Sequence, residues 1–415
     1  GGGLMQLVAY GAQDIYLTGN PQITFFKVVY RRHTNFAVES IEQTFNGSPD
    51  FNKYVTATIS RNGDLIQQMY LEVVLPTVAA SNVWVYGVGN ALIQKAEIEI
   101  GGQLIDRHYA EWLDIWTELS VSAGKRLGFD DMVGNKISGV DSAAAVRLYV
   151  PLQFWFNRNP GLALPLIALQ YHEVKLNIQF NTAASLCVIA GAATTPTALT
   201  SCKLYVDYVY LDTDERRRFA QVSHEYLIEQ VQFTGDETVA ANSTSKNFTL
   251  NFNHPCKELI WVHRLSSLPA STAAAANNYF NFGYTSGATS DTFLQGKLQL
   301  NGHDRFTERY ADYFRKVQNY EHHTRVPRTI GEMIPDSNSN VANYRQQYIY
   351  TYSFALSPEE HQPSGTCNFS RIDNAVLQLT YTTTITAAAM NLKVFAVNYN
   401  VLRIMSGMGG LAYSN

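Results

Sequence analysis

Two unlike patterns in the chain occur twice at the same separation of 201 residues, which divides the sequence into two similar halves. The first pattern is an apolar stripe with the spacing i, i+3, i+4 and i+7, found at Tyr109, Trp112, Leu113 and Trp116 and again at Tyr310, Tyr313, Phe314 and Val317. This spacing predicts a short amphipathic helix after a glycine turn. The second pattern is an alternating apolar segment at residues 174–180, matched by residues 375–381. A common offset for two independent element types indicates a tandem structural repeat.

Most apolar segments alternate with a period of two, which is typical of β-strands with one buried face. The clearest examples are residues 53–60, 92–100, 174–180, 248–252 and 375–381. The links between them contain no succession of helical patterns, so a doubly wound α/β sheet has little support. The sequence predicts two all-β sandwiches in tandem.

The boundary between the sandwiches is expected at the charged stretch that begins at Asp212. Residues 1–23 carry several glycines and Pro21 but no alternating run of strand length, so we predict an N-terminal arm without strands. The predicted division is therefore an arm at 1–23, a first sandwich at 24–213 and a second at 214–415.

The composition argues against direct nucleic-acid binding and for buried surfaces between subunits. Lys and Arg number 31 against 35 Asp and Glu, so no overall positive field exists to hold phosphates. Charged residues make up only 16% of the chain, whereas aromatic residues reach 12%. The four scattered cysteines are interpreted as reduced and buried. We find no signal-peptide pattern and no apolar run long enough to span a membrane, and we therefore expect a soluble protein.

Four long loops are expected to form interaction surfaces: residues 120–146, 182–201, 265–291 and 322–345. The loop 265–291 is rich in Ala, Ser, Thr and Asn, which cannot build a core, so we expect it at the outer surface.

No constellation of residues indicates catalysis, a cofactor or a metal. Residues 87–92 resemble a phosphate-binding loop, but a strand pattern follows them, so a hairpin turn is expected. The glycine-rich residues 406–410 are interpreted as a flexible or docked tail. The strongest metal candidates are His254, Cys256 and His263, with His322 and His323 elsewhere, and we interpret them as structural. Five carboxylates are candidates for acid–base catalysis, but the sequence pairs none of them as acid and base: Asp14, Asp64, Asp106, Glu111 and Asp304.

Five segments along the whole chain resemble the major capsid proteins of the large nucleocytoplasmic DNA viruses, in particular those of the chlorella-virus type. They are QLVAYGAQDIYLTGNPQITFFK (6–27), PGLALPLIALQYHEVKL (160–176), HEYLIEQVQFTG (224–235), QPSGTCNFSRIDN (362–374) and NYNVLRIMSGMGGLAY (398–413). The resemblance implies an all-β fold of two tandem eight-stranded jelly rolls with short helices in the loops. It implies no enzymatic activity and no cofactor.

The same resemblance implies a structural role in a virion. It implies a homotrimer that forms a pseudo-hexagonal capsomer and contacts neighbouring capsomers in an icosahedral shell. Minor capsid proteins would bind the inner face, an inner viral membrane would lie nearby without being spanned, and nucleic acid would not be contacted. Synthesis would take place in the host cytoplasm. The arm would lie under the capsomer.

Glycosylation on outward loops is also implied by the resemblance, at asparagines outside the usual sequon. Sequons occur at Asn46, Asn242, Asn247 and Asn368, although without a signal peptide the ordinary secretory route is closed. The candidate asparagines, including two in the loop 265–291, are Asn46, Asn242, Asn247, Asn278, Asn281 and Asn368.

Two other classes of function stay open on the residues alone. A β-sandwich can serve as a sugar-binding or host-attachment module, for which the aromatic residues 279–284 would supply stacking surfaces. It can also carry a hydrolase or metal site, for which we find no convergent set of residues.

Overall fold

The computed structural model describes residues 2–79, 82–135, 144–188, 195–268, 279–285, 290–327 and 347–414. The chain forms two units, Gly1–Phe36 and Ala37–Asn415. The first contains the short helices α1 (Gly2–Val8) and α2 (Ile15–Thr18), neither of which buries a side chain. Among its described residues no strand begins before Phe36, as predicted for residues 1–23.

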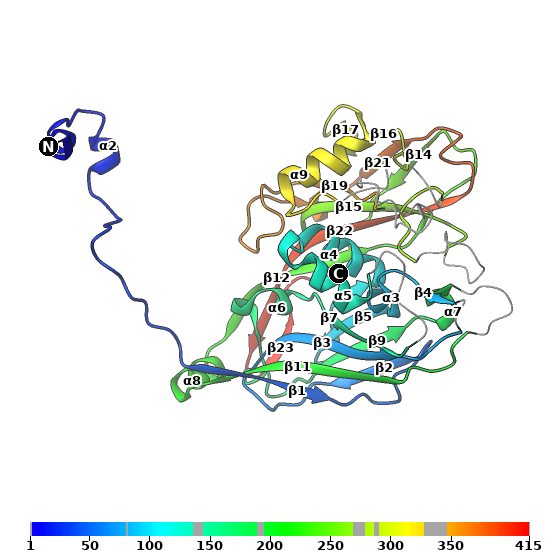
Figure 1. The fold of residues 1–415 in the computed structure, drawn as a ribbon, viewed down its shortest axis with the longest axis horizontal. Helices are drawn as coiled ribbons and strands as arrows, with labels where there is room; N and C mark the ends of the chain where they lie inside the picture. The colour runs from blue at the N-terminus through cyan, green and yellow to red at the C-terminus, as the bar shows by residue number, and fades with distance from the viewer. Residues whose placement is uncertain are drawn as a thin grey trace. The chain divides into compact units, whose positions relative to one another are not determined.

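The first half of the larger unit consists of two facing sheets (Figure 1). One sheet has the order β1-β11-β3-β7, and β8 also pairs with β3. The other has the order β2-β9-β5-β6. Their bounds are β1 (Phe36–Gln43), β2 (Tyr54–Thr58), β3 (Leu65–Leu75), β5 (Ile93–Ile100), β6 (Gln103–Tyr109), β7 (Val146–Pro151), β8 (Leu164–Pro165), β9 (Val174–Phe180) and β11 (Ser201–Leu211). A separate small pair joins β4 (Val83–Trp84) to β10 (Cys187–Val188).

The second half, from β12 onward, repeats this arrangement. One sheet has the order β12-β22-β15-β19 with β13, β20 and β23 at its margins, and the other has the order β14-β21-β16-β17 with β18 paired to β16. Their bounds are β12 (His224–Phe233), β13 (Glu237–Val239), β14 (Ser245–Thr249), β15 (Pro255–Leu265), β16 (Gln295–Leu300), β17 (His303–Asp304), β18 (Arg309–Tyr310), β19 (Tyr350–Ser353), β20 (Cys367–Asn368), β21 (Ala375–Thr380), β22 (Met390–Met405) and β23 (Met408–Leu411).

The strand order is the same in both halves. In each, the first, eighth, third and sixth principal strands form one sheet, and the second, seventh, fourth and fifth form the other. This is the connectivity of an eight-stranded jelly roll. The tandem repeat and the predicted double jelly roll are therefore confirmed, and β9 and β21 occupy equivalent positions as their offset required.

The alternating segments became strands with one partial exception. Residues 174–180 are β9, residues 93–100 are β5, and β2 and β21 lie within their predicted segments. The prediction for 248–252 was wrong beyond Thr249, where β14 ends. Its partner β21 begins at Ala375, whose carbonyl accepts from the Leu250 N–H at 2.8 Å, so β21 offers no partner residue beyond Leu250.

The two predicted helices follow equivalent strands, but only the first has the predicted apolar stripe. Helix α4 (Ala110–Ser120) buries Trp112, Leu113 and Trp116, whereas Tyr109, the first residue of the predicted stripe, is the last residue of β6 and is half-buried. In the second half a π-helical segment (Tyr313–Val317) precedes α9 (Gln318–His322). A π-helix bonds i to i+5, so residues spaced for an α-helix leave the common face. Phe314 is buried, whereas Tyr310 in β18 is 61% exposed and Val317 is 41% exposed.

Several other segments expected to be loops or turns are helical. Residues 87–92 do not form a hairpin turn, because α3 (Val88–Leu92) is a buried helical turn that enters through Gly87 at φ 61°. The loop 120–146 contains α5 (Ala123–Val133), whose few buried residues produce only a weak periodic signal. The remaining short helices are α6 (Trp155–Arg158), α7 (Ala183–Leu186) and α8 (Thr213–Gln221), with 3-10 turns at Pro160–Leu162 and Phe369–Arg371. Among the described residues, no helix is both long and apolar enough to cross a bilayer.

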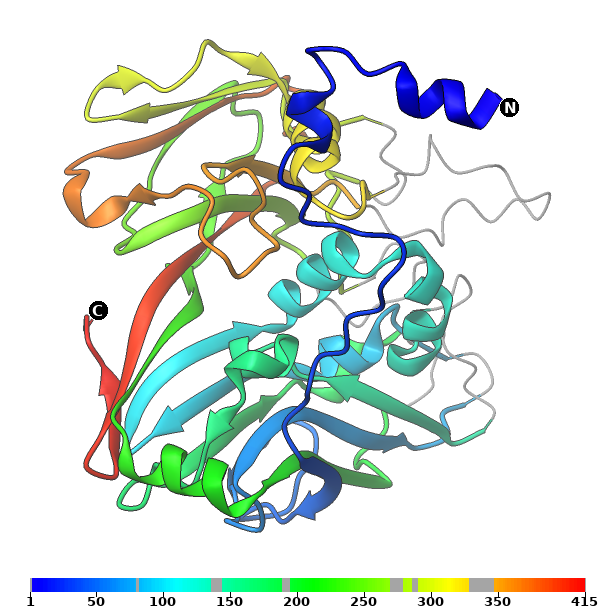
Figure 2. The same ribbon diagram turned by 90° about the vertical axis from the view of Figure 1, so that its left-hand side faces the viewer.

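The two jelly rolls share part of one hydrophobic core. The core of the first half includes Ile228 of β12 and Phe395 and Leu402 of β22. Strand β22 is 16 residues long and runs from the sheets of the second half down to those of the first (Figure 2). A second core cluster belongs to the second half alone. The jelly rolls therefore form one folded body.

Part of the loop 265–291 lies in this core and not at the surface. Tyr279, Phe280 and Phe282 are buried in the core of the first half. The expectation that the whole loop is exposed was wrong for these residues, because their aromatic side chains carry more apolar area than the Ala-rich stretch before them. Residues 269–278 and 286–289 lie outside the described part of the chain.

Candidate functional site

Helix α4 lies between the two jelly rolls (Figure 1), and its aromatic side chains contact residues of the second half. The rings of Trp112 and Trp116 stack with centroids 5.6 Å apart. Trp112 also lies 5.6 Å from the ring of Phe395 in β22, which in turn stacks on Phe233 of β12 at 4.8 Å. The stripe predicted from the sequence thus packs against both jelly rolls and not only its own. We call this region the junction.

The first ion-pair cluster of the junction surrounds Glu111 at the start of α4. Its carboxylate lies 3.2 Å from Nη1 of Arg264 and 3.9 Å from Nζ of Lys393, both from the second half. Burial alone would raise the pKa of this carboxyl, but the charges of Lys393 and Arg264 hold it below its ordinary value. Glu111 is therefore ionised and tied to the second jelly roll.

A second cluster surrounds Glu118, two turns along the same helix. Its carboxylate pairs with Arg126 of α5 and with Arg325 of the second half. Arg325 also donates from Nε to the Glu118 carbonyl at 3.0 Å, and its backbone N–H donates to the Leu119 carbonyl at 3.1 Å. These bonds fix the segment after α9 to the end of α4.

A third cluster surrounds Glu229 of β12. Arg158 of α6 reaches it at 2.8 Å, and Lys257 of β15 reaches it at 2.6 Å. His361 Nδ1 lies 3.6 Å away. Burial would raise the pKa of Glu229, but the hydrogen bond from His361 and the charges of Arg158 and Lys257 lower it to about 2. Arg158 also lies over the Trp116 ring at 4.8 Å, which brings the ionic and aromatic contacts together.

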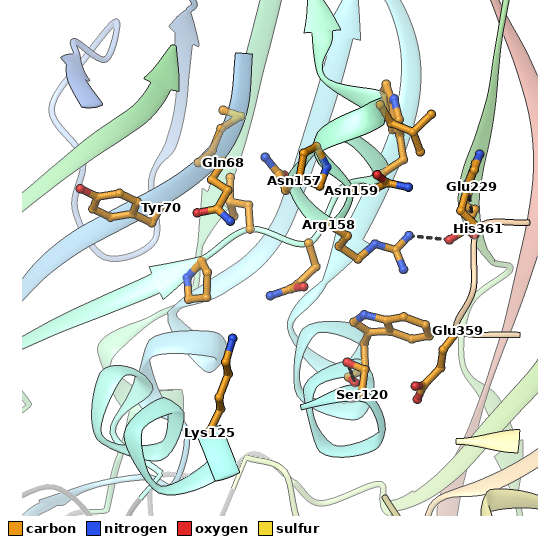
Figure 3. Close-up of a pocket in the computed structure, with 18 of the residues that line it drawn as sticks. Gln68, Tyr70, Ser120, Lys125, Asn157, Arg158, Asn159, Glu229, Glu359 and His361 are labelled. Atoms are coloured by element: carbon orange, nitrogen blue, oxygen red, sulfur yellow. Dashed lines mark hydrogen bonds and ion pairs between the residues drawn. The ribbon is translucent and has the colours of Figure 1, made fainter. Parts of the chain in front are cut away.

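The Glu229 cluster forms one end of a cavity of about 790 Å³ that both halves line. Figure 3 shows Arg158 reaching across it toward Glu229, with Glu359 and His361 on the same side and Lys125 and Tyr70 at the opposite end. The polar groups nearest the buried end are already bonded to one another. Their arrangement stabilises the relative orientation of the jelly rolls and provides no activated nucleophile.

His323 is a buried histidine near the junction that lies between two carboxylates. Its buried ring lies 2.7 Å from Glu258 and 2.9 Å from Glu359. Burial alone would lower the pKa of His323, but the two carboxylates outweigh it and raise the pKa to about 9. The imidazolium therefore links β15, the end of α9 and the loop that follows β19.

The structure does not bring the metal candidates together into a binding site. Nε2 of His263 lies 2.9 Å from the Tyr381 hydroxyl, and its Nδ1 lies 2.9 Å from the Thr292 hydroxyl. Burial lowers the pKa of His263 to about 3. His254 occupies a left-handed turn at φ 66°, and Cys256 lies in β15. His322 contacts the Leu356 carbonyl at 3.1 Å. Across the described ranges, no cluster of three or more His, Cys, Asp or Glu side chains could hold a metal ion.

The other candidates from the sequence have structural contacts. Asp64 pairs with Arg216 at 3.1 Å, Asp106 with His108 at 3.0 Å, and Asp304 with Lys297 at 3.5 Å. Asp14 accepts from the Gly11 backbone at 2.8 Å.

Residues 406–410 form the β22–β23 hairpin and dock onto the first jelly roll. The Gly409 backbone N–H lies 3.1 Å from His172, and the Tyr171 N–H donates to the Gly407 carbonyl at 2.9 Å. Of the two expectations for this tail, docking is the one observed.

The glycosylation candidates differ in their exposure. Four are exposed: Asn46, Asn242, Asn247 and Asn368. Asn281 is buried, with 3% of its surface exposed. Asn278 lies outside the described residues.

Sequence reasoning missed the ion pairs of the junction. A signal was present, because Glu111 and Glu118 lie seven residues apart and so on one face of the predicted helix. Their partners Arg264, Lys393 and Arg325 lie far along the chain, and no local pattern connects them.

Two family models match the chain. Residues 24–212 match the major capsid protein N-terminus, and residues 215–334 and 340–410 match the large eukaryotic DNA virus major capsid protein. The chain is 56% identical to the major capsid protein of Pyramimonas orientalis virus and 47% identical to that of Paramecium bursaria Chlorella virus 1, and each alignment covers 100% of both chains.

Solved structures show the same similarity. The quasi-atomic model of the PBCV-1 virus capsid matches with a TM-score of 0.77 at 40% identity, covering 94% of this chain and 100% of that one. The Faustovirus major capsid protein matches with a TM-score of 0.71 at 13% identity, covering 95% of this chain and 94% of that one, which supports the fold alone.

Proposed function

The chain belongs to the family of large eukaryotic DNA virus major capsid proteins, and from this premise we propose that three copies form a pseudo-hexagonal capsomer of an icosahedral shell. The chain is a structural component of the virion capsid. Six jelly rolls in a trimer supply the near-sixfold outline that hexagonal tiling needs, because the two rolls of one chain share one strand order. The shared core and the three ion-pair clusters support this proposal, since tiling requires a fixed angle between the rolls.

The mass and symmetry of the native assembly test this proposal. We expect a particle of three 46.4 kDa chains in solution, and sheets or shells at higher concentration. A stable monomer that never associates would contradict the trimer.

We propose the division into an arm at 1–23, a first jelly roll at 24–213 and a second at 214–415. The family-model boundaries near residue 212 support it, and helix α8 provides the connection. The N-terminal unit extends to Phe36, where β1 begins, so residues 24–35 lead from the arm into β1.

The arm is proposed to bind other chains of the shell from under the capsomer. Its large apolar side chains are exposed in its own unit, with Tyr16 at 92% and Leu17 at 84%. A surface of this kind requires a partner. Neighbouring capsomers and minor capsid proteins on the inner face are the partners we propose.

Deleting residues 2–23 tests the role of the arm. We expect the trimer to persist, because these residues bury no side chain in α1 or α2, while shell assembly fails. Loss of the trimer itself in the deleted protein would contradict an arm that acts between capsomers.

The remaining features of the proposed function concern the shell's surroundings. We propose that an inner viral membrane lies beneath the shell without being spanned, that the protein does not contact nucleic acid, and that it has no enzymatic activity. The net charge of −4 supports the absence of contact with nucleic acid. Synthesis in the host cytoplasm is part of the same proposal.

We further propose that any glycans are carried by the exposed candidates Asn46, Asn242, Asn247 and Asn368. Peptide mapping of purified virions by mass spectrometry tests this, and a glycan on Asn281 would contradict the fold around that residue. The sugar-binding alternative loses its main support, because Tyr279, Phe280 and Phe282 are core residues.

A further inference from the structure

Two of the four free cysteines lie directly opposite each other in neighbouring strands. Cys256 of β15 and Cys367 of β20 are partners in an antiparallel register. The other two have no such neighbour, since Cys187 is opposite Trp84 and Cys202 is opposite Val73. Only one of the six possible cysteine pairings is therefore supported by strand register.

The paired cysteines also share one face of their sheet. Residues directly opposite in an antiparallel ladder point to the same side. Accordingly, Cys256 is buried in the core of the second half and Cys367 packs against that same core while remaining partly exposed.

We propose that Cys256 and Cys367 form a cross-strand disulfide when the protein meets an oxidising environment. Directly opposite residues in an antiparallel pair have Cα atoms about 4.5 to 5.5 Å apart, which lies within the range of about 4.4 to 6.8 Å that disulfides span. The Cβ atoms of opposite residues are about 4.5 to 5.5 Å apart, against about 3.5 to 4.5 Å in a disulfide, so the bond requires side-chain rotation and a small approach of the two strands. This proposal does not depend on the trimer or on the shell.

The exchange proceeds in two steps with a small-molecule disulfide such as oxidised glutathione as the oxidant. The thiol of the partly exposed Cys367 loses its proton to water and attacks one sulfur of the oxidant. This forms a mixed disulfide and releases one glutathione thiolate. The thiol of Cys256 then loses its proton and attacks the sulfur of Cys367, which releases the second glutathione thiolate. Two protein thiols are oxidised and one disulfide is reduced.

The surroundings explain why the pair persists as thiols under reducing conditions. Burial raises the pKa of both thiols, so few thiolates are present at neutral pH and attack is slow. The redox state of the compartment then decides the outcome: a reducing cytoplasm leaves the pair open during synthesis, and an oxidising extracellular environment closes it.

The cross-link would hold the loop between β19 and β20 at both ends. The loop begins at Phe354, whose N–H donates to the Lys257 carbonyl at 2.8 Å, and it ends at Cys367 beside Cys256. Within it, Glu359 contacts His323 and His361 contacts Glu229. A disulfide at its end would restrict the loop that supplies two contacts to the junction.

Thiol mapping of the full chain tests the proposal. The folded protein is held in oxidised glutathione until its thiol content stops changing, then denatured in the presence of a maleimide, which reaches buried thiols as well, and digested. We expect two of the four thiols to be lost and a Cys256–Cys367 cross-linked peptide to appear. C367S should abolish that peptide, whereas the matched variant C202S, also at a partly buried strand position, should retain it.

Three results would overturn the proposal. One is a persistent glutathione adduct on Cys367 while Cys256 remains open to the maleimide. Another is recovery of all four cysteines as maleimide adducts. The last is a cross-link that involves Cys187 or Cys202 in place of this pair.

Discussion

Replacing Trp112 by Ala should destabilise both jelly rolls together. Its side chain is 2% exposed and contacts Trp116 in α4 and Phe395 in the second half. Truncating a buried aromatic side chain costs about 3 to 5 kcal/mol, because transfer energy is lost and a cavity remains. The two lost ring contacts, about 0.5 to 1.5 kcal/mol each, place the value in the upper part of that range.

The assay is guanidinium unfolding followed by circular dichroism, at one fixed chain concentration because association stabilises the folded state. Both halves should unfold in a single transition at a lower midpoint, since Trp112 belongs to a core that both supply. Tyr320→Ala is the matched control, because this aromatic residue of α9 is 81% exposed and its loss should change stability by no more than about 0.5 kcal/mol. A loss below about 1 kcal/mol for Trp112→Ala, or two transitions of which only one shifts, would refute the shared core.

Three further changes test other parts of the structure. The pKa of His323 is raised from 6.5 to about 9, so the stabilisation that its charge provides is complete below pH 6.5 and is lost as pH rises through 9. The Tm of the unchanged protein should therefore fall between pH 6.5 and 9, and the Tm of His323→Gln should fall less over the same range. An identical dependence of Tm on pH in both proteins would contradict the raised pKa. Arg325→Ala should lower the free energy of unfolding by about 1 to 3 kcal/mol, because Glu118 loses one of its two arginine partners. The loss is smaller than for a fully unpaired buried charge, since Arg126 still neutralises Glu118. An unchanged free energy of unfolding would show that the Glu118–Arg325 pair does not stabilise the junction. Gly89→Ala should lower the free energy of unfolding by about 1 to 3 kcal/mol, because the added Cβ would lie 2.8 Å from Val150 Cγ2. In the control Gly124→Ala the added Cβ meets no atom within 4 Å, so this variant should not be destabilised, and equal effects of the two changes would contradict the packing of α3.

The sequence by itself determined the class of fold and the repeat. Alternation with a period of two depends on each strand's own residues, so segments such as 174–180 became strands where predicted. The spacing of Trp112 and Trp116 likewise predicted α4, because residues four apart in a helix share a face whatever lies opposite. The family resemblance was carried by segments along the whole chain.

The tertiary structure alone decided which groups meet at the junction. Glu111 and Glu118 are local features of α4, but their partners Arg264 and Arg325 come from another jelly roll, and long-range pairing leaves no periodic trace in the sequence. The same holds for Tyr279 and Phe280, which the composition of the loop 265–291 predicted to be exposed and which the structure places in the core of the first half. Local periodicity specifies elements, whereas the packing of elements from distant parts of the chain specifies which charges are buried together and which aromatic side chains leave the surface.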